Sequence, residues 1–196
     1  MLLENLKNWK IILASKSPRR QELLKGLGLE FELRTKEISE DYPAALQAEE
    51  IPRFLSRKKA KAFLEELSAD ELVITSDTTV HLDGIVLEKP KDLDEAKSML
   101  QLLSGKMHKV ITAITIASVD YNATSHSVTE VQFAELTEAE IDYYVENFKP
   151  LDKAGAYGIQ EFIGFIGVTS IKGSYFNVMG LPLHLLYEEL KKVPSR

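Results

Sequence analysis

The stretch SKSPRRQELL, residues 15–24, follows an apolar run and places two arginines where a helix is expected to begin. The first turn of a helix leaves backbone N–H groups unpaired and carries a partial positive charge, so it favours anions. Guanidinium groups add bidentate hydrogen bonds to phosphate oxygens. The candidates for a phosphate site are therefore Ser15, Ser17, Arg19 and Arg20. An ordinary helix start with solvated arginines would produce the same pattern.

A carboxylate at the end of a buried strand is the second candidate. The segment ELVITSD, residues 71–77, reads as an apolar strand that ends at Asp77, and open α/β sheets place ligand-binding groups at such ends. Asp77 could hold a divalent cation or orient a water molecule, with Thr78 as a hydrogen-bonding neighbour. The alternative is that Asp77 caps a turn and Thr78 belongs to the next strand.

Two lysines lie in loops with unusual composition. Lys89 precedes Pro90, which forces an extended backbone and could project the ammonium towards a site. Lys153 lies in DKAGAYGIQ, residues 152–160, which is glycine-rich yet carries apolar residues that flexible linkers avoid. An exposed loop lysine and a weak surface ion pair with Asp152 are the alternatives for these two positions.

Several other chemistries are excluded or disfavoured. The sequence contains neither GxxxxGK[ST] nor GxGxxG after a strand, and it lacks a GxSxG elbow. Its four histidines do not have the spacing of a zinc site. There is no cysteine, which removes disulfides, thiolate nucleophiles and cysteine zinc sites and suits a reducing cytoplasm.

Bulk composition bounds the class of protein. A chain of 196 residues with 44% hydrophobic and 28% charged residues suits a single folded domain over residues 1–196. The net charge of −6 argues against nucleic-acid polymers as partners, so a phosphate site must be a local basic cluster. No apolar stretch is long enough to span a membrane, and the first residues do not read as a secretory signal. The expected location is the cytoplasm.

The elements that must position these residues alternate between strands and helices. Ser17 and Pro18 give an N-cap and a first helical residue, and that helix should reach Gly28. Residues 44–67 suggest one helix, or two broken near Pro52. Asp83-Gly84 is typical of a two-residue hairpin turn.

The second half of the chain follows the same alternation. Helices are expected over 92–104, over 137–148 behind a capping box, and from Pro182 onwards. Strands over 108–119 and 125–133 should pair antiparallel. The pattern predicts a mixed α/β fold without repeats, either one domain or one domain with two lobes.

Six blocks in sequence order resemble the Maf family: LASKSPRRQELL, TSDTTV, LEKP, LLSGKMHKVITA, DKAGAYGIQ and GSYFNVMGLPL. The resemblance covers nearly the whole chain. It implies a mixed twisted sheet flanked by helices, with two lobes and a central cleft, similar to inosine triphosphate pyrophosphatases. It also implies hydrolysis of nucleoside triphosphates between the α and β phosphates, giving a nucleoside monophosphate and pyrophosphate.

The resemblance also assigns roles to residues. It places the proposed general base at Asp77 and base or substrate selection at Arg19, Thr78 and Gln160. It places basic positions around the phosphates at Lys59, Lys89 and Lys153. An acidic residue near a Mg²⁺ or Mn²⁺ ion falls at Glu40, with Glu37 and Asp41 as nearby alternatives. Whether Asp77 is a base or a metal ligand is left open by the sequence.

The segment SDTTVHLDGIVLEKP resembles the branch of the family that acts on dTTP and UTP more than the branch that acts on 7-methyl-GTP. Ser76 stands where the family commonly has alanine. Gln160 carries both a donor and an acceptor, which suits the imide edge of thymine or uracil. Two alternatives stay open: hydrolysis of 7-methyl-GTP or other modified nucleotides, and a nucleotide-binding regulator of septum formation. A homodimer is similar to what the family shows.

Overall fold

The computed structural model describes residues 3–196, and the chain divides into two compact units. Unit 1 holds the residues up to Asp77 together with Thr112–Ser127 and Gly180–Arg196. Unit 2 holds Thr78–Ile111 and Val128–Met179. Each unit has its own cluster of buried hydrophobic residues.

Within residues 3–196, one mixed sheet of seven strands has the order β2-β1-β3-β5-β6-β7, and β4 pairs with β3 off this path. Its strands are β1 (Lys10–Leu13), β2 (Glu32–Leu33), β3 (Glu71–Leu82), β4 (Ile85–Leu87), β5 (Met107–Ala117), β6 (Asn122–Phe133) and β7 (Val168–Lys172). Strand β1 pairs parallel with β2 and β3, whereas β3–β4 and β6–β7 are antiparallel. The predicted mixed α/β class is confirmed.

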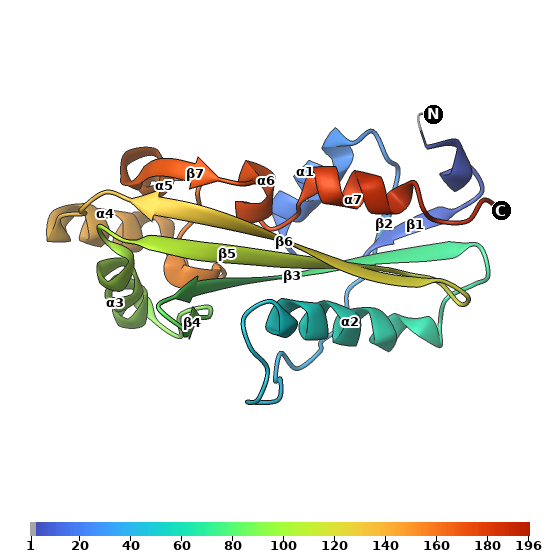
Figure 1. Cartoon of the computed structure of the whole chain (residues 1–196), viewed down its shortest axis with the longest axis horizontal. Coiled ribbons are helices and arrows are strands. Elements are labelled where there is room, and N and C mark those ends of the chain that lie inside the picture. The colour runs from blue at the N-terminus through green and yellow to red at the C-terminus, as the bar shows by residue number, and fades with distance from the viewer. Residues whose placement is uncertain (1–2) are drawn as a thin grey trace. The chain divides into compact units, whose positions relative to one another are not determined.

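Unit 1 contains β1, β2 and parts of β3, β5 and β6. Helix α2 (Glu50–Leu64) packs Ala60 and Phe63 against Ile12 of β1 and Val73 of β3. Figure 1 shows α1 (Pro18–Gly26) and α7 (Leu183–Leu190) on the other side of these strands. The 3₁₀ turn η1 (Glu4–Leu6) precedes β1. Apolar residues spaced at helical periodicity explain why α2 covers the sheet.

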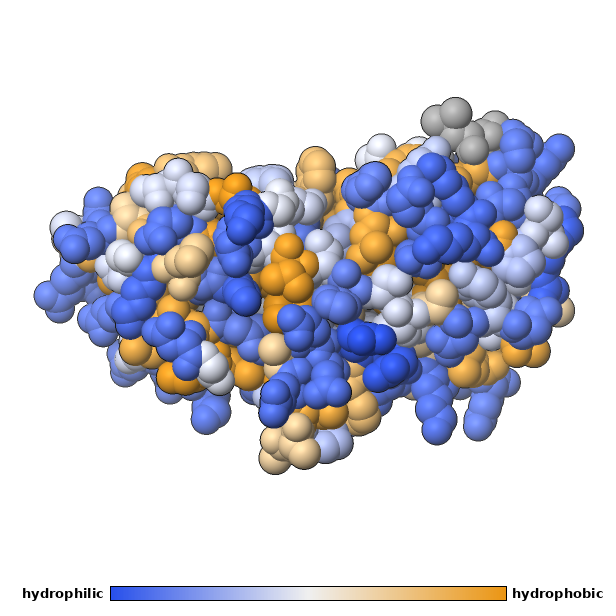
Figure 2. Space-filling model, in the orientation of Figure 1, coloured by the Kyte–Doolittle hydropathy of each residue, from blue (hydrophilic) through white to orange (hydrophobic). Residues whose placement is uncertain are grey.

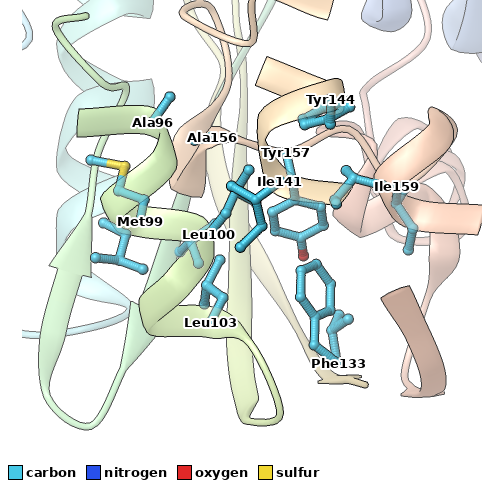
Figure 3. Close-up of a cluster of buried hydrophobic side chains, with 14 of the residues drawn as sticks. Ala96, Met99, Leu100, Leu103, Phe133, Ile141, Tyr144, Ala156, Tyr157 and Ile159 are labelled. Carbon is cyan, nitrogen blue, oxygen red and sulfur yellow. The ribbon is translucent and has the colours of Figure 1, made fainter. Parts of the chain in front are cut away.

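Unit 2 has an apolar interior of its own. Helices α3 (Leu93–Leu103) and α4 (Glu138–Phe148) enclose side chains from the strands and from the glycine-rich segment, as Figure 3 shows. The segment contains the 3₁₀ turn η2 (Ala154–Ala156) and leads into α5 (Phe162–Gly167); α6 (Tyr175–Val178) follows β7. Tyr157 and Ile159 are buried in this core, so the segment is packed structure and not a linker.

Local signals in the sequence locate several element ends correctly. Asp83 and Gly84 have φ of 51° and 84° at the β3–β4 hairpin, as a two-residue turn of this kind requires. Asp92 accepts a hydrogen bond from the Glu95 backbone at the start of α3. The capping box of Thr137 and Glu140 starts α4. Each of these signals depends only on neighbours in the chain.

Three boundaries differ from the prediction. Helix α2 begins at Glu50, so residues 44–49 lie outside it, and Pro52 is accommodated in its first turn because that N–H would be unpaired in any case. Helix α1 ends at Gly26 and not at Gly28. Strand β3 continues through Asp77 to Leu82, because the β-branched residues after Asp77 extend it into the hairpin.

Figure 2 shows one face on which hydrophilic residues dominate and hydrophobic residues occur as separate spots. No helix among residues 3–196 has the length and apolar character needed to cross a bilayer.

Candidate active site

Asp77 lies in the interior of β3, so the prediction that it ends a strand is wrong. Its side chain is only 9% exposed. The alternative in which Asp77 caps a turn is also contradicted, because residues on both sides of it belong to the strand. A carboxylate in such a position needs a partner, since burial of an unpaired charge is costly.

Lys59 supplies that partner from helix α2. Its Nζ lies 2.5 Å from Oδ1 of Asp77 and 2.7 Å from Oε1 of Glu40. The lysine side chain is 16% exposed, so water screens the pair with Asp77 only weakly. Strand β3, helix α2 and the loop before α2 therefore bring two carboxylates to a single ammonium group.

The protonation of Asp77 reflects this environment. Burial raises the pKa of its carboxyl group, because the charged form loses hydration. Lys59 and Arg20 lower the pKa of Asp77, and Glu40 adds to the increase. The balance is a carboxylate that takes up a proton more readily than an exposed aspartate does, which is a property of general bases.

The structure also separates the three acidic residues of the loop. Glu40 contacts Lys59, whereas Glu37 is 96% exposed and lies 3.7 Å from Lys16. Asp41 is engaged with the hydroxyl of Ser39. Glu40 is therefore the acid that shares the Lys59 ammonium with Asp77.

Arg20 forms hydrogen bonds to backbone carbonyls that the sequence did not predict. Its Nε donates to the Gly180 carbonyl at 2.7 Å, and one terminal nitrogen donates to the Ser76 carbonyl at 2.9 Å. The hydroxyl of Ser76 donates to the same Gly180 oxygen at 3.0 Å. These contacts tie α1 to β3 beside Asp77, and burial lowers the pKa of Arg20.

The other candidates at the start of α1, which are Ser15, Ser17 and Arg19, are half-buried or buried. Ser17 is the N-cap as predicted, but its side chain makes no capping hydrogen bond. Ser15 is buried, and its Oγ accepts from the Ser17 backbone N–H at 3.2 Å. Arg19 is half-buried next to Arg20. The predicted cluster of serines and arginines thus surrounds the first turn of a regular helix.

Three candidates of unit 2 lie on the segment 152–161 and on the loop after β4: Lys89, Lys153 and Gln160. Lys153 is 8% exposed, and its Nζ lies 2.7 Å from Asp152 and 3.3 Å from Glu161. The alternative of a surface ion pair is wrong for this lysine, because its side chain is buried. The side-chain oxygen of Gln160 is buried and accepts no hydrogen bond from the part of the chain that the structure describes.

Lys89 and Thr78 occupy different settings. Lys89 is exposed in the loop after β4, so the alternative interpretation of an exposed loop lysine is confirmed. The backbone of that loop is nevertheless fixed to the segment, because Gly155 N–H donates to the Glu88 carbonyl at 3.1 Å. Thr78 is half-buried in β3, directly after Asp77. Unit 2 therefore brings Lys89 and Lys153 onto two connected loops.

The oxygen donors around Lys59 bear on metal binding. Among residues 3–196 there is no group of three or more His, Cys, Asp or Glu side chains that could enclose a cation. Asp77 and Glu40 together offer two carboxylates, which fits a Mg²⁺ or Mn²⁺ ion that keeps several waters and takes other ligands from substrate phosphates. The residues present thus fit a substrate-carried metal, not a closed protein site.

Comparison with known proteins assigns the chain to a family. A family described as Maf-like protein matches residues 10–193, which is almost the entire chain. The chain belongs to the Maf family. The resemblance seen in the sequence blocks is therefore confirmed.

Relatives of this Maf chain carry a consistent name. A protein of Phocaeicola vulgatus named dTTP/UTP pyrophosphatase is 56% identical over 193 residues, covering 98% of this chain and 100% of its own length. Proteins with the same name from Bacteroides fragilis and Porphyromonas gingivalis are 50% and 49% identical. Their alignments cover 98% and 97% of this chain and 100% and 97% of theirs.

The fold has a distant counterpart among solved structures. The Staphylococcus aureus Ham1 protein superposes with a TM-score of 0.55 at 16% identity, over 93% of this chain and 98% of that one. At this identity the match supports the fold alone, and it agrees with the architecture expected for the Maf chain.

Two residues beside the predicted site of the Maf chain were missed from the sequence. Tyr144 of α4 and Glu161 at the N-cap of α5 are joined by a hydrogen bond, and Glu161 reaches Lys153. The only signal in the sequence was an acidic residue directly after Gln160. Nothing local in the sequence connects it to a tyrosine 17 positions earlier.

Proposed function

We propose that this protein hydrolyses nucleoside triphosphates, dTTP and UTP in particular, between the α and β phosphates. The products are the nucleoside monophosphate and pyrophosphate. Relatives that match the full length of the chain at about half identity are named for this activity. The observation that carries the proposal is the buried Asp77 carboxylate held by Lys59, which Glu40 shares.

In the proposed reaction, Asp77 takes a proton from the attacking water. The water oxygen bonds to the α phosphorus, and the bond from that phosphorus to the oxygen bridging to the β phosphorus breaks. Pyrophosphate leaves with the electron pair of the broken bond. Burial of Asp77 suits this role, because a raised pKa increases the basicity of the carboxylate near neutral pH.

Positive charge must hold the triphosphate, since the chain as a whole carries a net charge of −6. The proposed phosphate-binding groups are the basic side chains and the hydroxyls at the start of α1: Ser15, Ser17, Arg19, Arg20, Lys59, Lys89 and Lys153. Arg20 contributes mainly as a fixed charge, because two of its donors are used by backbone carbonyls. Lysines offer point charges that suit flexible phosphate chains.

A divalent cation is the proposed cofactor. When bound, it would neutralise negative charge that develops on the departing pyrophosphate. Asp77 and Glu40 are the protein groups that would hold it. If Asp77 serves mainly as a metal ligand, its replacement will raise the Mg²⁺ concentration needed for half-maximal activity, whereas loss of a general base will lower the rate at saturating Mg²⁺.

Gln160 and Thr78 are proposed to select the base. The buried Gln160 oxygen without a protein partner is an acceptor that a ligand N–H would satisfy. Thymine and uracil present such an N–H on their imide edge, whereas cytosine presents an acceptor at the same ring position. We expect dTTP and UTP to be preferred over dCTP and CTP.

The test is incubation of the purified protein with a panel of nucleoside triphosphates and Mg²⁺, with chromatographic separation of all phosphate-containing products. The panel includes 7-methyl-GTP and other modified nucleotides. Monophosphate and pyrophosphate from dTTP or UTP would support the proposal. Orthophosphate as the first product, or a clear preference for 7-methyl-GTP, would contradict it.

The remaining expectations belong to the same proposal. The chain would act as one Maf domain in the reducing cytoplasm, which suits a sequence without cysteine. A homodimer stays a prediction from the family resemblance, and sedimentation of the purified protein measures it.

A further inference from the structure

Glu161 uses its two carboxylate oxygens for two different partners. Its Oε2 accepts a hydrogen bond from the Tyr144 hydroxyl at 2.5 Å. Its Oε1 lies 3.3 Å from Nζ of Lys153. The Glu161 side chain is 21% exposed, so both contacts are partly shielded from water. A side chain engaged at both oxygens has one favoured position.

Tyr144 fixes the first of these contacts. Its ring is fully buried on α4, and Figure 3 shows it next to the segment that carries Tyr157 and Ile159. The hydroxyl donates to Glu161 and accepts from the Gly158 backbone N–H at 3.0 Å. Because both functions of the hydroxyl are used, Tyr144 connects the helix to both ends of the turn at 158–161.

The backbone leaves room for this carboxylate only because residue 158 is glycine. A Cβ atom at Gly158 would lie 2.7 Å from Cδ of Glu161. Further along, a Cβ at Gly164 would lie 2.1 Å from the Ile159 carbonyl oxygen, so α5 packs directly on the segment backbone. Such close approaches hold the segment in one conformation.

Lys153 receives its orientation from two carboxylates. An ammonium group has three N–H donors. Asp152 at 2.7 Å and Glu161 at 3.3 Å engage two of them. The lysine side chain is 8% exposed, so the direction of the third donor depends on these two partners and not on bulk water.

We propose that Glu161, held in place by Tyr144, is a positioning residue that aims the Lys153 ammonium at the pyrophosphate part of the substrate. This inference rests on the proposed function, because it assigns Lys153 to the phosphate chain. It goes beyond that function by naming two residues that do not contact the substrate and yet set its affinity. Pyrophosphate alone is a sufficient ligand to detect the effect.

The test compares Glu161→Gln with the wild-type protein. The amide keeps the size and still accepts from Tyr144, but its NH₂ group then faces the Lys153 ammonium and repels it. We expect the Kd of pyrophosphate, measured by calorimetry, to increase about tenfold, which is the loss of one charge-assisted contact. For dTTP we expect KM to rise by about the same factor with kcat within about twofold.

Two further measurements separate positioning from general damage. Tyr144→Phe removes only the hydroxyl and should weaken pyrophosphate binding in the same direction, by about threefold. The affinity for dTMP should change less than about twofold in both variants, because that product lacks the pyrophosphate part. Asp142→Asn on the same helix is the matched control, since Asp142 pairs with Lys97 at 2.6 Å and not with the segment.

Unchanged pyrophosphate affinity in Glu161→Gln would overturn the inference. Equal weakening of pyrophosphate and dTMP would also overturn it, because it would indicate a merely structural role. If the wild-type protein hydrolyses no nucleoside triphosphate, the proposed function fails, while the pyrophosphate titrations still decide whether Glu161 orients Lys153.

Discussion

The two units hold their charged groups by different means. In unit 1, regular elements do so: β3 carries Asp77 and α2 carries Lys59, whose Nζ lies 2.5 Å from the carboxylate. In unit 2, an irregular segment carries Lys153 and Gln160 and is fixed by hydrogen bonds, glycines and packed aromatic rings. A strand and a helix can bury an ion pair by packing against each other. A loop needs many local contacts to hold its side chains in equally well-defined positions.

This difference corresponds to a difference in chemistry. The cluster around Lys59 contains the group whose pKa is tuned by burial and by neighbouring charges. The segment and helix α4 of unit 2 contain aromatic groups that stay neutral, since burial raises the pKa of Tyr157 and burial with the Glu161 contact raises the pKa of Tyr144. We infer that the proton chemistry belongs to unit 1, whereas the candidates of unit 2 are recognition groups only. The predictions below test that division.

The largest effect should come from Asp77→Asn. Loss of the carboxylate should lower kcat about 10³-fold, in the range that general bases contribute. The amide is close in size to the carboxylate, and Lys59 keeps Glu40 as a partner, so the midpoint of thermal unfolding should change by only a few degrees. Turnover within about tenfold of wild type would remove Asp77 from the chemistry.

Gly164→Ala should be the most destabilising small change in the glycine-rich part of unit 2. The new Cβ would meet the Ile159 carbonyl oxygen at 2.1 Å, so the free energy of unfolding should fall by about 3 kcal/mol. Denaturant titration measures it. Gly26→Ala in α1 is the control, because nothing lies within 4 Å of its Cβ and alanine favours a helix.

His108 should make unit 2 sensitive to acid. Burial lowers its pKa from 6.5 to about 4, and its Nε2 lies 2.8 Å from the Tyr157 hydroxyl. The unfolded chain takes up the proton first, so stability is complete above pH 6.5 and is lost as the pH falls towards about 4. A shift of this size corresponds to about 3 kcal/mol.

His108→Gln should remove most of that loss, since glutamine can still bond the Tyr157 hydroxyl but does not titrate. The measurement is denaturant unfolding at several pH values between 4 and 7, compared with wild type. Identical pH dependence in the two proteins would show that His108 does not determine the acid sensitivity.

The smallest effect is a shift in a pH profile. Lys59 lowers the pKa of Asp77, so Lys59→Met should raise that pKa further. If the carboxylate is the active form, the residual kcat/KM should begin to fall at a higher pH than in wild type. Lys58→Met is the control, because Lys58 bonds the Asp41 carbonyl and not Asp77. An unmoved acid limb would argue that Asp77 does not act as the base.

The class of fold and most element starts could be predicted from the amino-acid sequence alone. Capping at Asp92 and Thr137 and the hairpin at Asp83 could be predicted because each depends on residues three or fewer positions apart. The sequence also indicated the family and the candidate residues, because the six motif blocks occur in the expected order along the chain. The pattern of apolar residues could not show that β3 continues beyond Asp77, because the polar residues Ser76 and Asp77 resemble the end of a strand.

The partners of the candidate residues could be identified only in the folded chain. The fold selected Glu40 over its acidic neighbours, gave Arg20 two backbone carbonyls to hold, and buried Lys153 beside Glu161. These contacts join residues from 8 to 160 positions apart in the chain. The physical reason is that burial and Coulomb interactions depend on distance in space, which no local pattern of residue types encodes.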